Sequence, residues 1–288
     1  MYYGIILLAV VFFGGCFALN DVYRRLRGSS LRISMESAFI GSCAGLIILL
    51  AAGGLHIEIT LFTLVMALLS SLNGLAFTFC AFRALDRINL SLFSLFSMLG
   101  GMVLPFLQGI LFFNEPLTWG KCICLAFITV ALTITVSRGN QRGGAIYYIG
   151  IFVLNGMSGV LSKIFTAASF PKTDAASFNF WCAVFSGLLA GAIWLILTWR
   201  KKPQDGAFSW RATAGGAVSG ATKRLANLLL VMALAHVDAS VQYPMVTGGV
   251  MIASTLICLL GKRKPSTRDV LSVLLAFLGM LALFAIPV

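Results

Sequence analysis

Residues 175–198 read AASFNFWCAVFSGLLAGAIWLILT, an apolar stretch without a charged side chain. A helix of this length can cross a hydrocarbon core about 30 Å thick. Similar runs recur along nearly the whole sequence, in which 59% of the 288 residues are hydrophobic and only 10% are charged. A soluble domain of this size needs far more polar surface to cover its core. The sequence therefore predicts an all-α integral membrane protein.

Short breaks with polar or turn-forming residues separate ten such runs. Arg200-Lys201-Lys202-Pro203 is one example of a break. We expect ten transmembrane helices over residues 2–20, 33–53, 61–82, 91–112, 119–137, 145–167, 175–198, 212–234, 239–260 and 269–287. The breaks leave no room for a soluble domain, so the function must reside in the helices and their connections.

An internal repeat relates the two halves of the chain. A shift of 149 residues aligns Ala84 with Ala233, Ser91 with Ser240, Gly100 with Gly249, and Pro116 with Pro265. The same shift pairs the third, fourth and fifth runs with the eighth, ninth and tenth. We therefore expect two five-helix domains, 1–140 and 141–288. Because five is odd, the second half must enter the membrane with opposite orientation, which makes an inverted repeat of five plus five helices.

The basic residues predict the orientation. Loops after odd-numbered runs hold sixteen Lys and Arg residues, whereas Lys121 and Lys172 are the two in loops after even-numbered runs. Basic loops stay in the cytoplasm, so both termini are expected outside. The net charge of +12 is spread over these short clusters and forms no continuous face, which argues against a nucleic-acid partner.

The acidic residues, histidines and cysteines exclude several kinds of chemistry. All nine acids lie at the edges of runs or in loops: Asp21, Glu36, Glu58, Asp86, Glu115, Asp174, Asp205, Asp238 and Asp269. Proton or sodium coupling through a buried carboxylate thus has no obvious residue. The histidines, His56 and His236, lie at the ends of runs, and the seven cysteines form no zinc-ligand pattern. We expect no catalytic residue, no metal and no cofactor.

Positive charges, in contrast, lie inside apolar runs. Lys223 and Arg224 fall in the middle of the eighth run, and Lys163 lies toward the end of the sixth. A charge near the middle of a membrane costs at least ~2.5–3.5 kcal/mol. One interpretation is an electropositive cavity that binds a carboxylate or phosphate of a substrate. The alternative is a structural cation bonded to carbonyl or amide groups of neighbouring helices.

Uncharged polar residues supply the other candidates for substrate binding. Asn73 and Asn227 lie on repeat-related helices, and Gln242 and Tyr243 lie on the ninth. Together with Lys223 they form the predicted substrate-binding set. Pro244, Gly248 and Gly249 are the predicted hinge, because proline interrupts a helix and adjacent glycines let it bend.

One stretch resembles a known family. Ser91-Leu-Phe-Ser, followed later by Phe113-Asn114-Glu115-Pro116-Leu117-Thr118 and an apolar helix, is similar to an EamA-type domain of the drug/metabolite transporter superfamily. Lys163 resembles the lysine that often ends the sixth helix of that family. Two EamA-like domains in ten helices would cover the whole chain. Lys264-Pro265 departs from the pattern, since it stands where the second domain usually has a Glu.

These observations favour a secondary transporter rather than an enzyme. The expected activity is export or exchange of small metabolites, such as amino acids or related anionic or zwitterionic solutes, by a monomer in the bilayer. The resemblance implies a multi-pass protein of a bacterial plasma (inner) membrane. The alternatives are a membrane-embedded lipid-modifying enzyme and a non-transporting assembly or lipid-handling subunit.

Overall fold

The computed structural model describes the backbone of residues 2–53, 57–112, 118–136, 145–199, 209–234, 239–260 and 265–285. These residues form ten α-helices and no strand. The helices are α1 (Tyr2–Arg27), α2 (Leu31–Gly53), α3 (Leu61–Leu85), α4 (Leu90–Phe112), α5 (Trp119–Val136), α6 (Ala145–Ala167), α7 (Ala175–Trp199), α8 (Trp210–Leu234), α9 (Ala239–Leu260) and α10 (Thr267–Ala285). The all-α architecture expected from the sequence is therefore confirmed.

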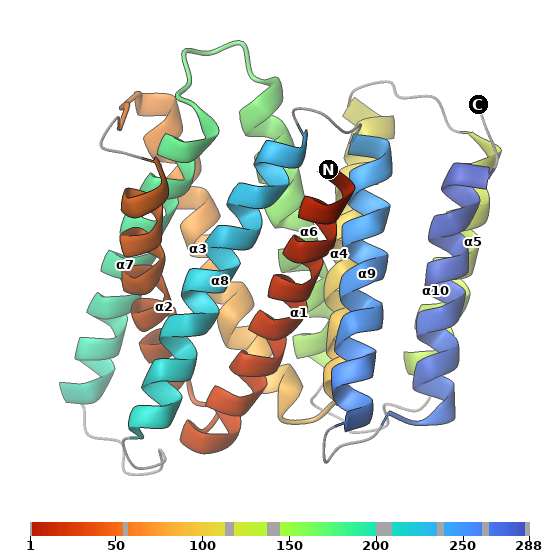
Figure 1. Cartoon of the computed structure of the whole chain (residues 1–288), viewed down its shortest axis with the longest axis horizontal. Coiled ribbons are helices and arrows are strands. Elements are labelled where there is room, and N and C mark those ends of the chain that lie inside the picture. The colour runs from red at the N-terminus through yellow and green to blue at the C-terminus, as the bar shows by residue number, and fades with distance from the viewer. Residues whose placement is uncertain are drawn as a thin grey trace.

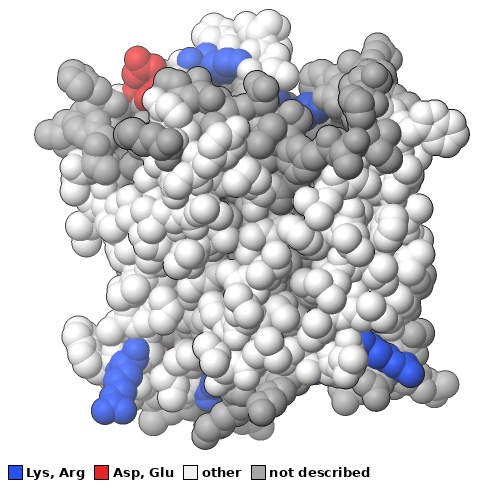
Figure 2. Space-filling view, turned by 45° about the vertical axis from the view of Figure 1, so that its right-hand side comes forward, with Lys and Arg blue, Asp and Glu red and all other residues white. Residues whose placement is uncertain are grey.

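Six of the described helices are long and apolar enough to cross a membrane: α1, α2, α3, α4, α6 and α7. Large apolar side chains cover their outer surface, and charged residues gather at the two ends of the face shown in Figure 2, with an uncharged band between them. A band of this kind matches the hydrocarbon core of a bilayer. The chain is a multi-pass membrane protein.

The helices stand side by side in two layers (Figure 1). One layer has the order α2, α8, α1, α9 and α10, and the other has the order α7, α3, α6, α4 and α5. The layers join where α2 packs on α7, α4 on α9 and α5 on α10. Between these joints α1 also contacts α3 and α4, whereas α8 makes no extended contact with α3, nor α1 with α6, over the described residues. The layers are thus joined through α1 near the centre of the molecule and are packed on one another least closely between α8 and α3.

Both termini lie at the same end of the bundle, which we call the terminal end (Figure 1). The loops after α1 and α3 lie at the opposite end, called the basic end because the sequence places most Lys and Arg residues there. At this end α1 is longer than expected and runs to Arg27 rather than stopping near residue 20. Asp21 forms ion pairs with Arg24 and Arg25 within the helix, at 2.9 Å and 2.5 Å. Such pairs one turn apart allow a helix to continue through charged residues.

Glycines allow neighbouring helices within a layer to approach closely. Gly220 of α8 lies against the backbone of Gly41 of α2, and Gly100 of α4 lies against the backbone of Phe152 of α6. A β-carbon at either glycine would overlap backbone atoms of the neighbouring helix. Small residues serve this purpose in membrane helix packing. Neighbouring helices within each layer are therefore closely packed.

Candidate functional site

Lys223 lies half-way along α8, deep in the bundle, yet its side chain is exposed. It makes no hydrogen bond and no ion pair with any residue that the structure describes. Cys16 of α1 is near enough to interact with it electrostatically. An unpartnered ammonium at this depth needs water or an anion beside it, because the hydrocarbon core offers neither.

The neighbours of Lys223 on α8 show which way its side chain points. Successive residues of an α-helix are turned by about 100°, so Lys223 projects in a direction between those of Ser219 and Gly220. The Ser219 hydroxyl lies 3.1 Å from Cys16 Sγ of α1, while Gly220 faces Gly41 of α2. Lys223 therefore points into the angle between α1 and α2.

That angle opens toward the opposite layer. Ala212 precedes Lys223 by about three turns on the same side of α8, and it packs with Phe82 of α3 in one buried cluster. Because α3 belongs to the other layer, this side of α8 faces the inside of the bundle. Lys223 thus projects between the layers and not into lipid.

Two helices of the opposite layer are open at the same height. On α3 the inward-facing Ala81 is buried in a core cluster. Gly74 lies two turns away on the same side of the helix, and a β-carbon at this position would meet no atom within 4 Å. On α6 the inward-facing Ile151 is buried in that cluster, while Ser158, also two turns on, is exposed. We call the region bounded by Lys223, Gly74 and Ser158 the central space.

A chain of polar side chains links α1 to α8 beside Lys223. Ser219 Oγ donates to Asn20 Oδ1 at 3.0 Å, and Asn20 Nδ2 donates to Cys16 Sγ at 3.8 Å. Cys16 and Ser219 are buried, and Asn20 is half-buried. These groups are neutral hydrogen-bonding groups at the edge of the central space, and they fix the position of α8 relative to α1.

The structure separates the two adjacent cations. The side chain of Arg224 lies against Gly45 of α2, where a β-carbon would be 2.6 Å from Arg224 Cγ. Cys182 of α7 lies near its guanidinium group. Arg224 is therefore directed sideways, toward α2 and α7, while Lys223 faces inward. This is the divergence expected for consecutive helical residues.

The other predicted site residues have different surroundings. Asn227 lies one turn beyond Lys223, half-buried and on the same side of α8. Asn73 donates to the carbonyl oxygen of Leu154 in α6 at 2.8 Å, a contact that joins two helices of one layer. Among the hinge residues, Gly248 is buried and Gly249 packs against Val10 of α1. The side chains of Gln242, Tyr243 and Pro244 lie outside the part of the chain that the structure describes.

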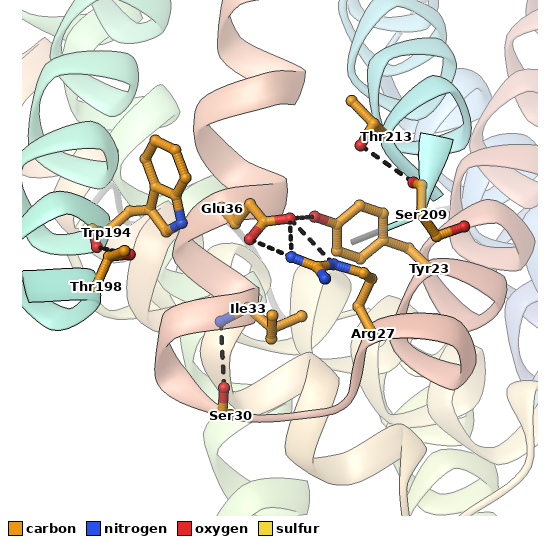
Figure 3. A network of polar contacts seen from close by, with 9 residues as sticks. All are labelled: Tyr23, Arg27, Ser30, Ile33, Glu36, Trp194, Thr198, Ser209 and Thr213. Atoms are coloured by element: carbon orange, nitrogen blue, oxygen red, sulfur yellow. Dashed lines mark hydrogen bonds and ion pairs between the residues drawn. The ribbon is translucent and has the colours of Figure 1, made fainter. Parts of the chain in front are cut away.

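At the basic end the central space is closed by packed and ion-paired residues. Tyr23, Phe82, Ile33 and Ala212 form a buried cluster that joins α1, α2, α3 and α8. Tyr23 Oη donates to Glu36 Oε1 at 2.8 Å, and Arg27 Nη2 donates to both oxygens of Glu36 at 2.7 Å (Figure 3). The turn between α1 and α2 that allows this contact has Gly28 at a φ of +108°, which favours glycine.

A second ion-pair group joins the two layers at the basic end. The buried side chain of Arg24 in α1 contacts Asp21 at 2.9 Å and also pairs with Asp86, which follows α3. Ser29 donates to the second oxygen of Asp86. We call Arg24, Asp86 and Ser29 the basic-end clasp. Because it ties α1 to α3, the layers cannot separate at this end without breaking it.

Sequence reasoning singled out Lys223 and Asn227 as candidates but did not indicate their surroundings. The candidate residues that it chose lie on α3, α8 and α9, whereas the structure places α1 directly beside Lys223, through Cys16 and Asn20. Small polar residues within apolar runs carry little signal by themselves. Their significance depends on which helices pack together, and no local pattern indicates that.

The comparisons with known proteins bear on the fold. No family model matches the sequence, and no curated protein is similar to it. Among 27 matching chains of solved structures, one crystal structure, described only as that of a protein, superposes with a TM-score of 0.57. The match covers 97% of this chain and 99% of the other, at 15% sequence identity. A likeness this distant supports the arrangement of helices over the whole chain and says nothing about activity.

Proposed function

We propose that the chain is a secondary transporter, which moves a small organic solute across the plasma membrane by alternating access to the central space. The observation that carries the proposal is the exposed, unpartnered ammonium of Lys223, half-way along α8 on the side that faces the other layer. A charge in this place costs at least ~2.5–3.5 kcal/mol unless it is hydrated or meets an anion. A substrate with a carboxylate or phosphate would supply that anion.

The arrangement of the ends supports alternating access. Packed residues and the basic-end clasp close one end. Toward the terminal end the inner side of α6 stays exposed, at Ser158 and again one turn later at Ser162. A central site that is closed at the basic end, and whose α6 lining is exposed toward the terminal end, fits one of the two states that such a transporter needs.

Contacts within each layer support the proposed inverted repeat of ten transmembrane helices. Gly100 of α4 lies against Phe152 of α6, and Gly249, which the 149-residue shift aligns with Gly100, lies against Val10 of α1. The shift also aligns Leu104 of α4 with Ala253 of α9. Leu104 lies against Gly156 of α6, and Ala253 lies against Gly14 of α1. Residues of α4 and α9 that the shift aligns thus make similar contacts, with α6 in one half and with α1 in the other.

A third correspondence involves α2 and α7. The shift aligns Ser71 of α3 with Gly220 of α8. Gly220 contacts Gly41 of α2, and the Ser71 hydroxyl donates to the carbonyl oxygen of Cys182 in α7 at 2.9 Å. These contacts support two EamA-like domains, 1–140 and 141–288. In inverted-repeat transporters the site lies near the bilayer midplane between the repeats, which is the position of Lys223.

Solute counterflow in reconstituted vesicles tests the proposal. Vesicles loaded with one candidate metabolite should take up the labelled metabolite, and Lys223→Gln should weaken its apparent affinity. The loss should be roughly ten- to hundredfold, because a hydrogen bond to a charged group contributes ~1.5–3 kcal/mol. Lys172→Gln is the matched control and should transport normally, because Lys172 lies exposed at the terminal end and binds carbonyl groups there. No counterflow of any organic solute would contradict the proposal.

The described carboxylates lie at the ends of the helices, so the proposed mode is exchange or facilitated movement. A proton or sodium gradient imposed on vesicles without internal solute should then produce little accumulation. Strong gradient-driven accumulation that persists in Lys223→Gln would contradict this mode.

A further inference from the structure

We infer that the central space selects small organic anions that carry no cationic group, and that it discriminates against zwitterions such as free amino acids. This inference rests on the proposed function and specifies its substrate class. It starts from Lys223, whose charge faces the central space while Arg224 is turned toward α2 and α7.

The carboxylates that the structure describes do not face the central space. Most of them are held at helix ends by cations or by helix-capping N–H groups: Asp21 by Arg24 and Arg25, Glu36 by Arg27, Asp86 by Arg24, Asp174 by the N–H of Ser177, and Asp269 by the N–H of Ser266. Glu58 precedes α3 at the terminal end and is exposed. A substrate ammonium would find no carboxylate partner among them.

The other groups beside Lys223 are neutral and already engaged. Ser219, Asn20 and Cys16 bond to one another. An anion that binds Lys223 therefore gains its main electrostatic partner, and the neutral groups are left undisturbed. A zwitterion would bring a second positive charge near Lys223, and like charges close to each other repel.

The electrostatic potential of the central space can be measured without knowing the substrate. Asn227→Cys is introduced into a chain whose seven cysteines are replaced by serine or alanine. Its reaction rates with an anionic and a cationic methanethiosulfonate reagent of similar size are compared. With Lys223 present, the anionic reagent should be favoured, and Lys223→Gln should lower the anion-to-cation rate ratio by about tenfold.

Three controls keep this measurement decisive. Lys223→Arg, which preserves the charge, should preserve the rate ratio, and Lys172→Gln should leave it unchanged. Added salt should reduce the ratio in the Lys223 protein itself, because ions screen the charge. A ratio that is insensitive to Lys223, a preference for the cationic reagent, or no reaction with either reagent would overturn the inference.

Matched solutes then test substrate selection by protecting Asn227→Cys from the reagent. L-lactate is compared with L-alanine, and glutarate with L-glutamate. The anion of each pair should protect at a concentration at least about tenfold lower than the amino acid. Equal protection by both members, or protection by neither, would overturn the inference. Selective protection without counterflow of any solute would support the inference about anions and contradict transport. Efficient counterflow of the amino acids would support transport and contradict the inference about anions.

Discussion

Lys223 and Gly74 occupy corresponding positions in the two halves, because the 149-residue shift aligns them. One half thus supplies a charge to the central space, and the other supplies room, since a β-carbon on Gly74 would meet nothing within 4 Å. The internal symmetry of the helices is therefore not carried through to the side chains of the site. This asymmetry gives the two layers different roles in binding.

Filling the space at Gly74 should stop transport and leave the fold intact. Gly74→Leu would place a branched side chain in the space that is free around a β-carbon at this position. We therefore expect counterflow to fall at least about tenfold while the unfolding temperature stays near that of the native chain. Gly74→Ala should be tolerated. Native counterflow by Gly74→Leu would show that solute does not pass this point.

At the residue scale the sequence predicts charges better than it predicts neutral partners. Lys223 can be identified because a cation inside an apolar run demands a reason. Ser219 and Asn20 cannot, because Ser and Asn in membrane helices usually bond to whichever neighbour is near. Asn73 illustrates this, since its amide is used to bond Leu154 of α6.

At the element scale, close crossings within each layer hold the fold together. Gly220 lies against the backbone of Gly41, where α8 crosses α2, whereas a β-carbon on Gly215 of the same helix would meet nothing within 4 Å. Substitution of each glycine by alanine therefore compares a tightly packed position with an open one on the same helix.

Gly220→Ala should destabilise the protein and Gly215→Ala should not. The added methyl group at Gly220 must push α2 away from α8, and overpacking of this kind typically costs about 1–3 kcal/mol. Thermal unfolding in detergent should show a lower midpoint for Gly220→Ala alone. Equal midpoints for the two variants would contradict the described crossing of α2 and α8.

Helix positions follow from the sequence more closely than helix lengths and neighbours do. The apolar runs predict where each of the ten helices lies. The extension of α1 to Arg27 depends on ion pairs with Asp21, which an apolar run does not indicate. The placement of α1 beside α8 depends on long-range packing, and no repeat or run specifies it.

At the scale of the whole molecule, the basic loops predict a defined orientation. Arg87, after α3, should lie in the cytoplasm, and Lys172, between α6 and α7, should lie outside. In a cysteine-free chain in intact cells, a membrane-impermeant thiol reagent should label Lys172→Cys and spare Arg87→Cys. The opposite labelling pattern would reverse the orientation and leave the fold unchanged.

The central claim is that Lys223 lies in a space reached from one side of the membrane at a time. Reaction of Asn227→Cys with an impermeant reagent, applied separately to each side of oriented vesicles, tests it most directly. With the basic-end clasp intact, the reagent should react from the terminal side. Asp86→Asn weakens the clasp between α1 and α3, so reaction from the basic side should appear and reaction from the terminal side should decline. Reaction from neither side, or accessibility that Asp86→Asn leaves unchanged, would contradict the account.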